Sequence, residues 1–300
     1  MADLALTAIM AIWGSTFALT RLLLGDAGGT ASAISPLALI AVRMGLATLL
    51  LGLFLAATPA GRQQLRAAFQ GALLRDGLLC GALLGFGFFL QVEGLQRTTA
   101  SRSGFLTGLL VVLVPLLEFL FFRKRPAAPA LVALALAFLG LTLLSAPGSA
   151  GASATALGDL LTVSCAVIFA GHVVLLGRVA KRHPVLPLLL LQLLCTFALA
   201  ALLGPVVEAQ RFAGSGRLWL AVSYLAVFAT LLAFGIQTWA QKLMPAVRVA
   251  LLSSLEPVFA ALWAALFIGE RLSGHELLGG ALIVVGVLVG EAGTALRARA

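Results

Sequence analysis

The sequence repeats itself, because a cut near residue 150 leaves two halves that present the same landmarks in the same order. A second correspondence, at an offset of 156, pairs Ala11-Ile12-Trp13 with Val167-Ile168-Phe169. The main correspondence has an offset of 146 and relates Gln91 to Gln237, Arg102 to Arg248, Leu106-Thr107 to Leu252-Ser253, Arg125 to Arg271, and Gly140 to Gly286. The sequence therefore predicts two copies of one unit, at residues 1–150 and 151–300.

Each predicted unit consists of apolar segments. The chain is 61% hydrophobic and 10% charged, with a mean hydropathy of +1.11, whereas soluble domains are about 45–50% apolar. About 20 apolar residues cross the hydrocarbon layer of a membrane. Ten such segments lie near 4–24, 36–58, 76–96, 103–122, 128–146, 157–177, 185–207, 218–241, 246–268 and 276–293. This pattern predicts an all-α integral membrane protein with ten transmembrane helices, five in each half.

Basic residues are distributed unevenly among the predicted loops and the C-terminal tail. One side of the membrane holds 13 Lys and Arg residues and the other side holds five. Cytoplasmic loops are enriched in Lys and Arg, so we expect both termini in the cytoplasm. The net charge of +9 then reflects topology beside anionic lipids. It does not indicate nucleic-acid binding, because a basic domain with interleaved aromatic residues is missing from the sequence.

The odd number of segments per half determines the symmetry. After five crossings, the second half enters the membrane from the opposite side, so the repeats are inverted about an axis in the membrane plane. The charges of two matching loops are consistent with this inversion. The basic loop Arg123-Lys124-Arg125-Pro126 follows the fourth segment on the cytoplasmic side, whereas Gly269-Glu270-Arg271-Leu272, which contains an acidic residue, follows the ninth segment on the outer side. Inverted repeats allow a central site to open to each side in turn. The sequence therefore predicts a transporter that works by alternating access.

Several stretches resemble the EamA-type transporters of the drug/metabolite transporter superfamily. Residues 250–272, with Glu256-Pro257 and Gly269-Glu270-Arg271, and residues 279–286 are similar to the ninth and tenth helices of that family. Residues 12–17 and 36–43 are similar to its first and second helices, and residues 98–140 form the first-half counterpart of its ninth and tenth.

The resemblance covers essentially the whole chain, and it implies a ten-helix carrier of the bacterial inner membrane. Such carriers typically export amino acids or other small metabolites. One departure is Lys124, where the family commonly has a glutamate, and this weakens a binding role for that loop. The sequence contains no nucleotide-binding segment, so we expect no cofactor, and we expect a small-molecule metabolite and the lipid bilayer as partners.

Polar and aromatic residues inside the predicted segments are the candidate site. Ionisable groups at membrane depth are costly and usually face the interior of a helix bundle. The candidate substrate-binding residues are Trp13, Thr16, Arg43, Gln91, Glu93, Thr107, His172, Gln237, Trp239 and Ser253.

Several of these residues have two interpretations. Arg43 could bind a substrate carboxylate or neutralise Glu93, whereas Glu93 could couple protons or pair with Arg97 one turn away. His172 could also couple protons or be a hydrogen-bonded packing residue. Trp13 and Trp239 could form an aromatic surface for the solute or anchor helices at the membrane interface.

Two prolines, Pro115 and Pro257, are candidate hinges. They lie in the fourth and ninth segments, four residues out of the 146-residue register, which is about one helical turn. A proline inside a helix removes a backbone hydrogen bond and lets the preceding turn bend. The kink beside Ser253, Ser254 and Glu256, which precedes Pro257, could frame a site or serve as a hinge, and the hinge or packing interpretation is favoured.

Other functions remain as alternatives. A lipid-linked or nucleotide-sugar translocator would share the ten-helix architecture, although only Arg43 and Arg21 place positive charge within the segments. An enzyme is disfavoured because the sequence has no HExxH, GxSxG or paired-aspartate arrangement. Cys80, Cys165 and Cys195 lack metal-site spacing, so neither a metal nor a disulfide is expected. The solute, the coupling ion, the direction of net flux and the oligomeric state stay open, with a monomer as the working expectation.

Overall fold

The computed structural model describes residues 1–24, 33–98, 100–144, 155–268 and 274–299. Among the features discussed from the sequence, the loop 269–273 and the side chains of Arg21 and Arg102 lie outside the described residues. The elements are helices, together with one isolated bridge between Ile34 and Phe212. First-half helices are α1 (Ala2–Leu24), α2 (Pro36–Ala56), α3 (Pro59–Ala68), α4 (Gly71–Leu95), α5 (Ala100–Gly108), α6 (Leu110–Phe122) and α7 (Ala128–Leu144). Second-half helices are α8 (Ala156–Val179), α9 (Val185–Val207), α10 (Gly216–Ala226), the π-helical turn η1 (Val227–Leu232), α11 (Ala233–Leu243), α12 (Ala246–Ser253), α13 (Leu255–Ile268) and α14 (Gly274–Arg299).

The described residues include eight segments long and apolar enough to cross a membrane. These are Ala2–Leu24, Pro36–Ala56, Gly71–Leu95, Ser103–Phe122, Ala156–Val179, Val185–Val207, Gly216–Leu243 and Ala246–Trp263. Two shorter apolar helices, Ala128–Leu143 and Leu277–Gly290, lie at the remaining predicted positions. The prediction of an all-α, multi-pass membrane protein is therefore confirmed, while the inverted ten-helix repeat stays a prediction.

Two helices are interrupted at corresponding places. The break between α5 and α6 falls at Leu109, and the break between α12 and α13 falls at Ser254. Near the second break, Pro257 has no N–H to donate, and the Ser253 hydroxyl donates to the Val249 carbonyl at 2.9 Å, a contact that often bends helices. Pro115 differs, because it lies inside the continuous helix α6, six residues after Leu109.

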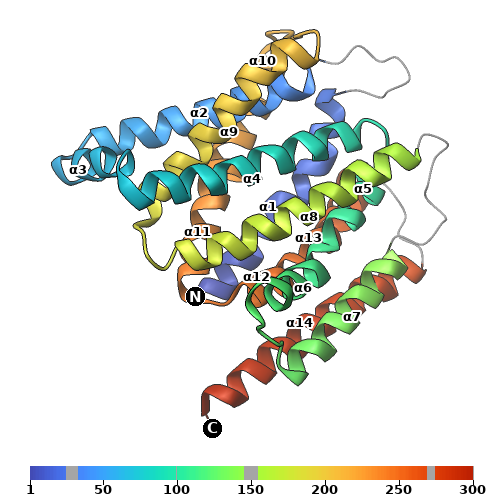
Figure 1. Ribbon diagram of the computed structural model, residues 1–300. Coiled ribbons are helices and arrows are strands. Elements are labelled where there is room, and N and C mark those ends of the chain that lie inside the picture. The colour runs from blue at the N-terminus through green and yellow to red at the C-terminus, as the bar shows by residue number, and fades with distance from the viewer. Residues whose placement is uncertain (25–32, 99, 145–154, 269–273, 300) are drawn as a thin grey trace.

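Helix contacts occur in related pairs. Helix α4 packs against α8, and their counterparts in the other half, α11 and α1, also pack against each other. Helix α8 contacts α5 and α6, and its counterpart α1 contacts α12 and α13, which are the counterparts of α5 and α6. Helices α2 and α9 pack against each other, and so do α7 and α14, which lie side by side at the edge of the bundle (Figure 1). Exchanging each first-half helix for its second-half counterpart reproduces these contacts.

The α7–α14 pair depends on small residues. A Cβ atom built on Gly140 would lie 2.5 Å from the Gly279 carbonyl oxygen, and one built on Gly286 would lie 2.8 Å from the Ala133 carbonyl oxygen. Both distances are shorter than real Cβ atoms adopt, so the glycines allow the two backbones to approach closely. Gly140 and Gly286 are also one of the pairs separated by 146 residues.

Candidate functional site: the central cavity

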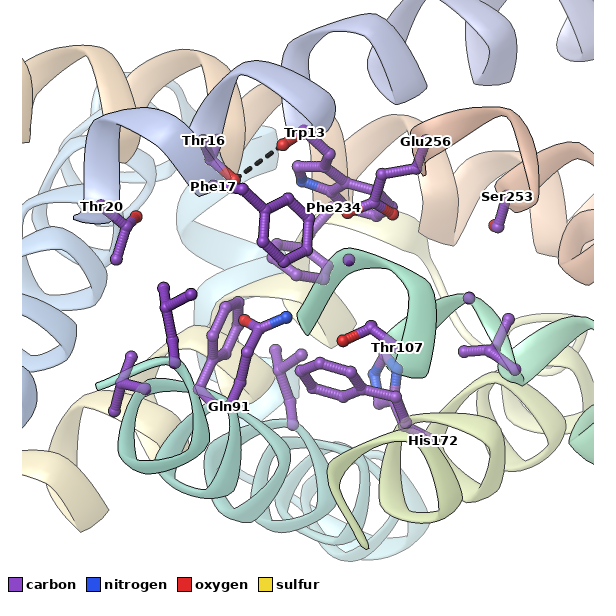
Figure 2. Close-up of a pocket in the computed structure, with 18 of the residues that line it drawn as sticks. Trp13, Thr16, Phe17, Thr20, Gln91, Thr107, His172, Phe234, Ser253 and Glu256 are labelled. Atoms are coloured by element: carbon purple, nitrogen blue, oxygen red, sulfur yellow. Dashed lines mark hydrogen bonds between the residues drawn. The ribbon is translucent and has the colours of Figure 1, made fainter. Parts of the chain in front are cut away.

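A cavity lies at the centre of the bundle, between helices from both halves of the chain (Figure 2). It contains about 1080 Å³ of empty space, including the part open to solvent. Nine of the twelve candidate residues line it. They are Trp13, Thr16, Arg43, Gln91, Thr107, His172, Gln237, Ser253 and Pro257.

The lining follows the internal register of the sequence. At an offset of 146, both members line the cavity for the pairs Phe88/Phe234, Gln91/Gln237, Gly104/Ala250, Thr107/Ser253 and Leu110/Glu256. At an offset of 156, the same holds for Trp13/Phe169, Thr16/His172 and Phe17/Val173. The two halves therefore contribute matching positions to one chamber.

Arg43 is held at the cavity wall by two contacts. Its side chain reaches from α2 to η1, where Nε donates a hydrogen bond to the Thr230 hydroxyl at 3.0 Å. Its guanidinium carbon lies 5.0 Å from the centroid of the Phe88 ring, within the range of a cation–π interaction. Arg43 is only 6% exposed, and among the described residues it forms no ion pair with Glu93 or any other acid. Of the two interpretations of Arg43, neutralisation of Glu93 is therefore not seen, because Glu93 pairs with Arg97.

His172 lines the cavity from α8 and is almost fully buried. Its Nε2 donates to the Gln192 amide oxygen of α9 at 2.8 Å, and the Gln192 amide nitrogen donates to the Leu188 carbonyl. This chain of hydrogen bonds fixes the imidazole orientation. His172 thus combines a packing role with a position on the cavity wall.

Two buried polar atoms of the lining lack partners. The Thr107 hydroxyl and the Gln237 amide oxygen have no hydrogen-bond partner within the described chain, although both residues are more than nine-tenths buried. An unsatisfied buried polar group costs about 1–3 kcal/mol. Figure 2 shows Thr107 and His172 on the wall opposite Glu256. Both residues line the cavity.

Aromatic rings form a connected row along the wall. Phe88 contacts Phe169 and Phe234, with ring centroids 5.5 and 5.9 Å apart. Phe234 in turn lies 5.1 Å from the Trp13 ring, and the Trp13 indole N–H donates to the Ala229 carbonyl at 2.9 Å. The sequence pointed to Trp13 but not to the three phenylalanines.

Three candidate residues lie away from the cavity. Glu93 forms an ion pair with Arg97 one turn along α4, Trp239 is 37% exposed on α11, and Pro115 is buried within α6. Glu93 and Trp239 each follow a lining glutamine by two residues, and two residues turn a helix by about 200°. Their side chains therefore point to the opposite face.

Glu256 lines the cavity although it was not among the candidate substrate-binding residues. It does so from the first turn of α13, whereas the sequence favoured a hinge or packing role over a part in framing a site. No hydrogen bond or ion pair within the described chain involves its carboxyl group. The available signal was its spacing, because Glu256 lies three residues after Ser253 and hence on the same helix face.

Polar contacts join the helices toward one end of the cavity. Asp3 of α1 pairs with Arg248 of α12 at 3.1 Å, and the Gln241 amide nitrogen of α11 donates to the Val173 carbonyl of α8 at 2.6 Å. On α1 and α4, the residues that line the cavity extend toward the C-terminal ends of the helices, as far as Thr20 and Leu95. The cavity is therefore asymmetric along the bundle.

The described residues contain no group of three or more His, Cys, Asp or Glu side chains placed to hold a metal ion. The cavity lining presents one cation, one carboxyl group, polar side chains and aromatic walls. The arrangement is suited to holding a small amphipathic molecule.

Comparison with known proteins agrees with this geometry. The model of the EamA-like transporter family matches residues 1–146 and again residues 156–289. A protein of Archaeoglobus fulgidus named an uncharacterized transporter is 30% identical over 292 residues, which cover 96% of this chain and 85% of that protein. A protein of known crystal structure shares the fold, with a TM-score of 0.77 at 22% identity over 99% of this chain and 98% of the other. This chain is a membrane transporter and belongs to the EamA-like transporter family.

Proposed function

We propose that the protein is a secondary transporter that exports small metabolites such as amino acids by alternating access. The observation that supports this proposal is the lining of the cavity, to which the two halves of the chain contribute residues at matching positions. A single chamber built from two equivalent units can open toward either side at similar energetic cost.

The inverted repeat is supported by two further observations. The family model matches the chain twice, once in each half, and the helix contacts recur when counterparts are exchanged. Five crossings per half place the halves in opposite orientations. The proposed units are residues 1–150 and 151–300.

The orientation follows from the distribution of basic residues. With both termini in the cytoplasm of a bacterial cell, the Asp3–Arg248 ion pair lies at the inner end, and the cavity opens outward.

The alternative is transport of a lipid-linked or nucleotide-sugar molecule. It receives less support, because Arg43 is the one cation that lines the described cavity, and a pyrophosphate favours several. Exchange assays separate the two classes of solute.

The test is counterflow in proteoliposomes. Vesicles containing the purified protein and preloaded with unlabelled amino acids should accumulate the matching radiolabelled amino acid transiently, whereas protein-free vesicles should not. Accumulation of labelled nucleotide sugars alone, or of no solute, would contradict the proposal.

A further inference from the structure

We propose that a single extra residue in the second half, accommodated by the π-helical turn η1, positions Trp13 and Arg43 in the cavity wall. The inference rests on the proposed transport function, because both residues line the cavity. It adds the Thr230 hydroxyl and the Ala229 carbonyl as positioning groups. It also explains why one helix departs from the internal repeat.

The extra residue is visible in the pattern of buried positions along two corresponding helices. Helix α4 of the first half corresponds to the continuous segment of α10, η1 and α11 in the second. Before η1, buried residues match at an offset of 145, in the pairs Leu73/Leu218, Gly77/Val222, Cys80/Leu225 and Gly81/Ala226. After η1 they match at an offset of 146, in the pairs Gly87/Ala233, Phe88/Phe234, Val92/Thr238 and Gly94/Ala240. The register therefore changes by one residue within η1.

A π-helical turn accommodates such a residue without rotating the helix on either side of it. Its hydrogen bonds join residues five apart, and it occurs mostly as a single turn inside an α-helix, frequently at functional sites. Here the Ala233 N–H donates to the Phe228 carbonyl, five residues earlier. More residues per turn make the helix wider at this level. The matching stretch of α4, residues 81–86, is regular α-helix.

The wide turn accepts hydrogen bonds from two side chains of the first half. The Trp13 indole N–H donates to the Ala229 carbonyl at 2.9 Å, and Arg43 Nε donates to the Thr230 hydroxyl at 3.0 Å. Both acceptor residues are fully buried. A buried donor without an acceptor is costly, so these two acceptors hold the indole and the guanidinium at the cavity wall.

The first half lacks both donors at the matching places. Trp13 corresponds to Phe169, which has no N–H on its ring, and Arg43 corresponds to a leucine at either offset. Phe169 packs on α4 at Gly87 instead, because a Cβ built on that glycine would overlap the Phe169 ring. The half that contains the extra residue is thus the half that receives the two donors. This coincidence is the observation that carries the inference.

The first experiment removes the extra residue. Deletion of Leu232, which is 44% exposed, gives the turn as many residues as the matching turn of α4. The helices on both sides should keep their buried faces, so the apparent melting temperature should fall by no more than about 5 °C. The matched control is deletion of Phe86 in regular α4, which is 48% exposed. That deletion rotates the rest of the helix by about 100°, and the protein should not fold.

The same deletion tests the position of Trp13 without a transport assay. The indole N–H resonance of Trp13 is identified in the NMR spectrum of ¹⁵N-labelled protein by its absence in Trp13→Phe. Deletion of Leu232 narrows the turn and withdraws the Ala229 carbonyl, so this resonance should shift. Thr238→Val should leave it in place, because the buried Thr238 hydroxyl donates only within α11, to the Phe234 carbonyl at 2.7 Å.

The second experiment removes one acceptor. Thr230→Val keeps the shape of the side chain and deletes the hydroxyl that holds Arg43, whereas Thr230→Ser keeps the hydroxyl. In counterflow of radiolabelled L-phenylalanine, Thr230→Val should raise the half-saturation concentration about fivefold or more and change the maximal rate less than about twofold. Thr230→Ser should restore the wild-type value. The control Thr238→Val should not alter it.

Several outcomes would overturn the inference. Failure of the Leu232 deletion to fold, or equal tolerance of both deletions, would refute the extra residue. An unmoved Trp13 resonance in the Leu232 deletion, or an unchanged half-saturation concentration in Thr230→Val, would refute the positioning role. If no amino acid shows counterflow, the proposed function fails, while the two deletions and the Trp13 resonance still decide the inference.

Discussion

The two walls of the cavity have nearly the same shape but different charge. Phe88, Gln91 and Thr107 of the first half correspond to Phe234, Gln237 and Ser253 of the second, so rings, amides and hydroxyls recur in register. The walls differ where Leu110 faces the cavity in one half and Glu256 in the other, and where Thr16 corresponds to His172. The comparison suggests that equal shape serves movement between two states, whereas unequal charge serves recognition.

The largest effect is expected when the two walls are made alike. Glu256→Leu replaces the carboxyl group with the residue found at the matching position. A buried charged contact between this carboxyl group and the solute is worth about 2–5 kcal/mol, so the initial rate of amino-acid counterflow should fall at least about thirtyfold. Leu110→Met, a volume-conserving change on the opposite wall, is the control and should retain most of the rate. Similar rates for both variants would remove the functional difference between the walls.

The next effect concerns the glycines that match between the halves. Gly140→Leu and Gly286→Leu should each destabilise the protein by about 1–3 kcal/mol through overpacking of the α7–α14 contact, and lower its apparent melting temperature. Gly52→Leu is the control, because nothing lies within 4 Å of a Cβ at that position. If only one of the two glycines is sensitive, the two sides of this contact are not equivalent.

A smaller effect is expected at the prolines, where the halves differ. Pro257→Ala restores an N–H near the break at Ser254, and one hydrogen bond is worth about 1 kcal/mol. The variant should slow net transport about fivefold while changing solute affinity less. Pro115→Ala should have a weaker effect on the rate, because α6 already runs through Pro115. Equal losses in rate and affinity for both variants would indicate static kinks.

The smallest effect is expected at Glu93. Its ion pair with Arg97 lies outside the cavity and is partly exposed, and such pairs contribute about 0.2–1 kcal/mol. Glu93→Gln should therefore change the counterflow rate less than about threefold and leave its pH profile unchanged. A flattened pH profile would instead restore Glu93 as the group that couples protons.

The sequence predicted the helices well for a physical reason. A membrane requires about 20 apolar residues per crossing, so composition alone sets the position and length of each segment. Composition did not predict α3, because this polar helix of 10 residues lies between two crossings and needs no apolar run. The break at Leu109 was also unpredicted, since the proline in that helix lies six residues further along.

The site was predictable only where polarity is unusual. Glutamines and hydroxyls in apolar segments stand out, and Gln91, Gln237, Thr107 and Ser253 all line the cavity. Phenylalanine does not stand out, because Phe54 and Phe121 of the same chain are exposed on outer faces, where lipid would contact them. The rings that line the cavity could be identified only once the helices were placed.

The most direct test of alternating access uses cysteines at one matching pair of positions. Thr20 lines the open end of the cavity, and its counterpart at an offset of 156, Leu176, is fully buried near the closed end. In a background with Cys80, Cys165 and Cys195 replaced by alanine, Thr20→Cys and Leu176→Cys are labelled with a membrane-impermeant thiol reagent from each side, with and without a solute gradient. The inverted repeat predicts reciprocal changes, with Thr20→Cys reacting from the periplasm and Leu176→Cys from the cytoplasm as the other becomes protected. Labelling of both from one side, or no reaction of Leu176→Cys in any gradient, would contradict it.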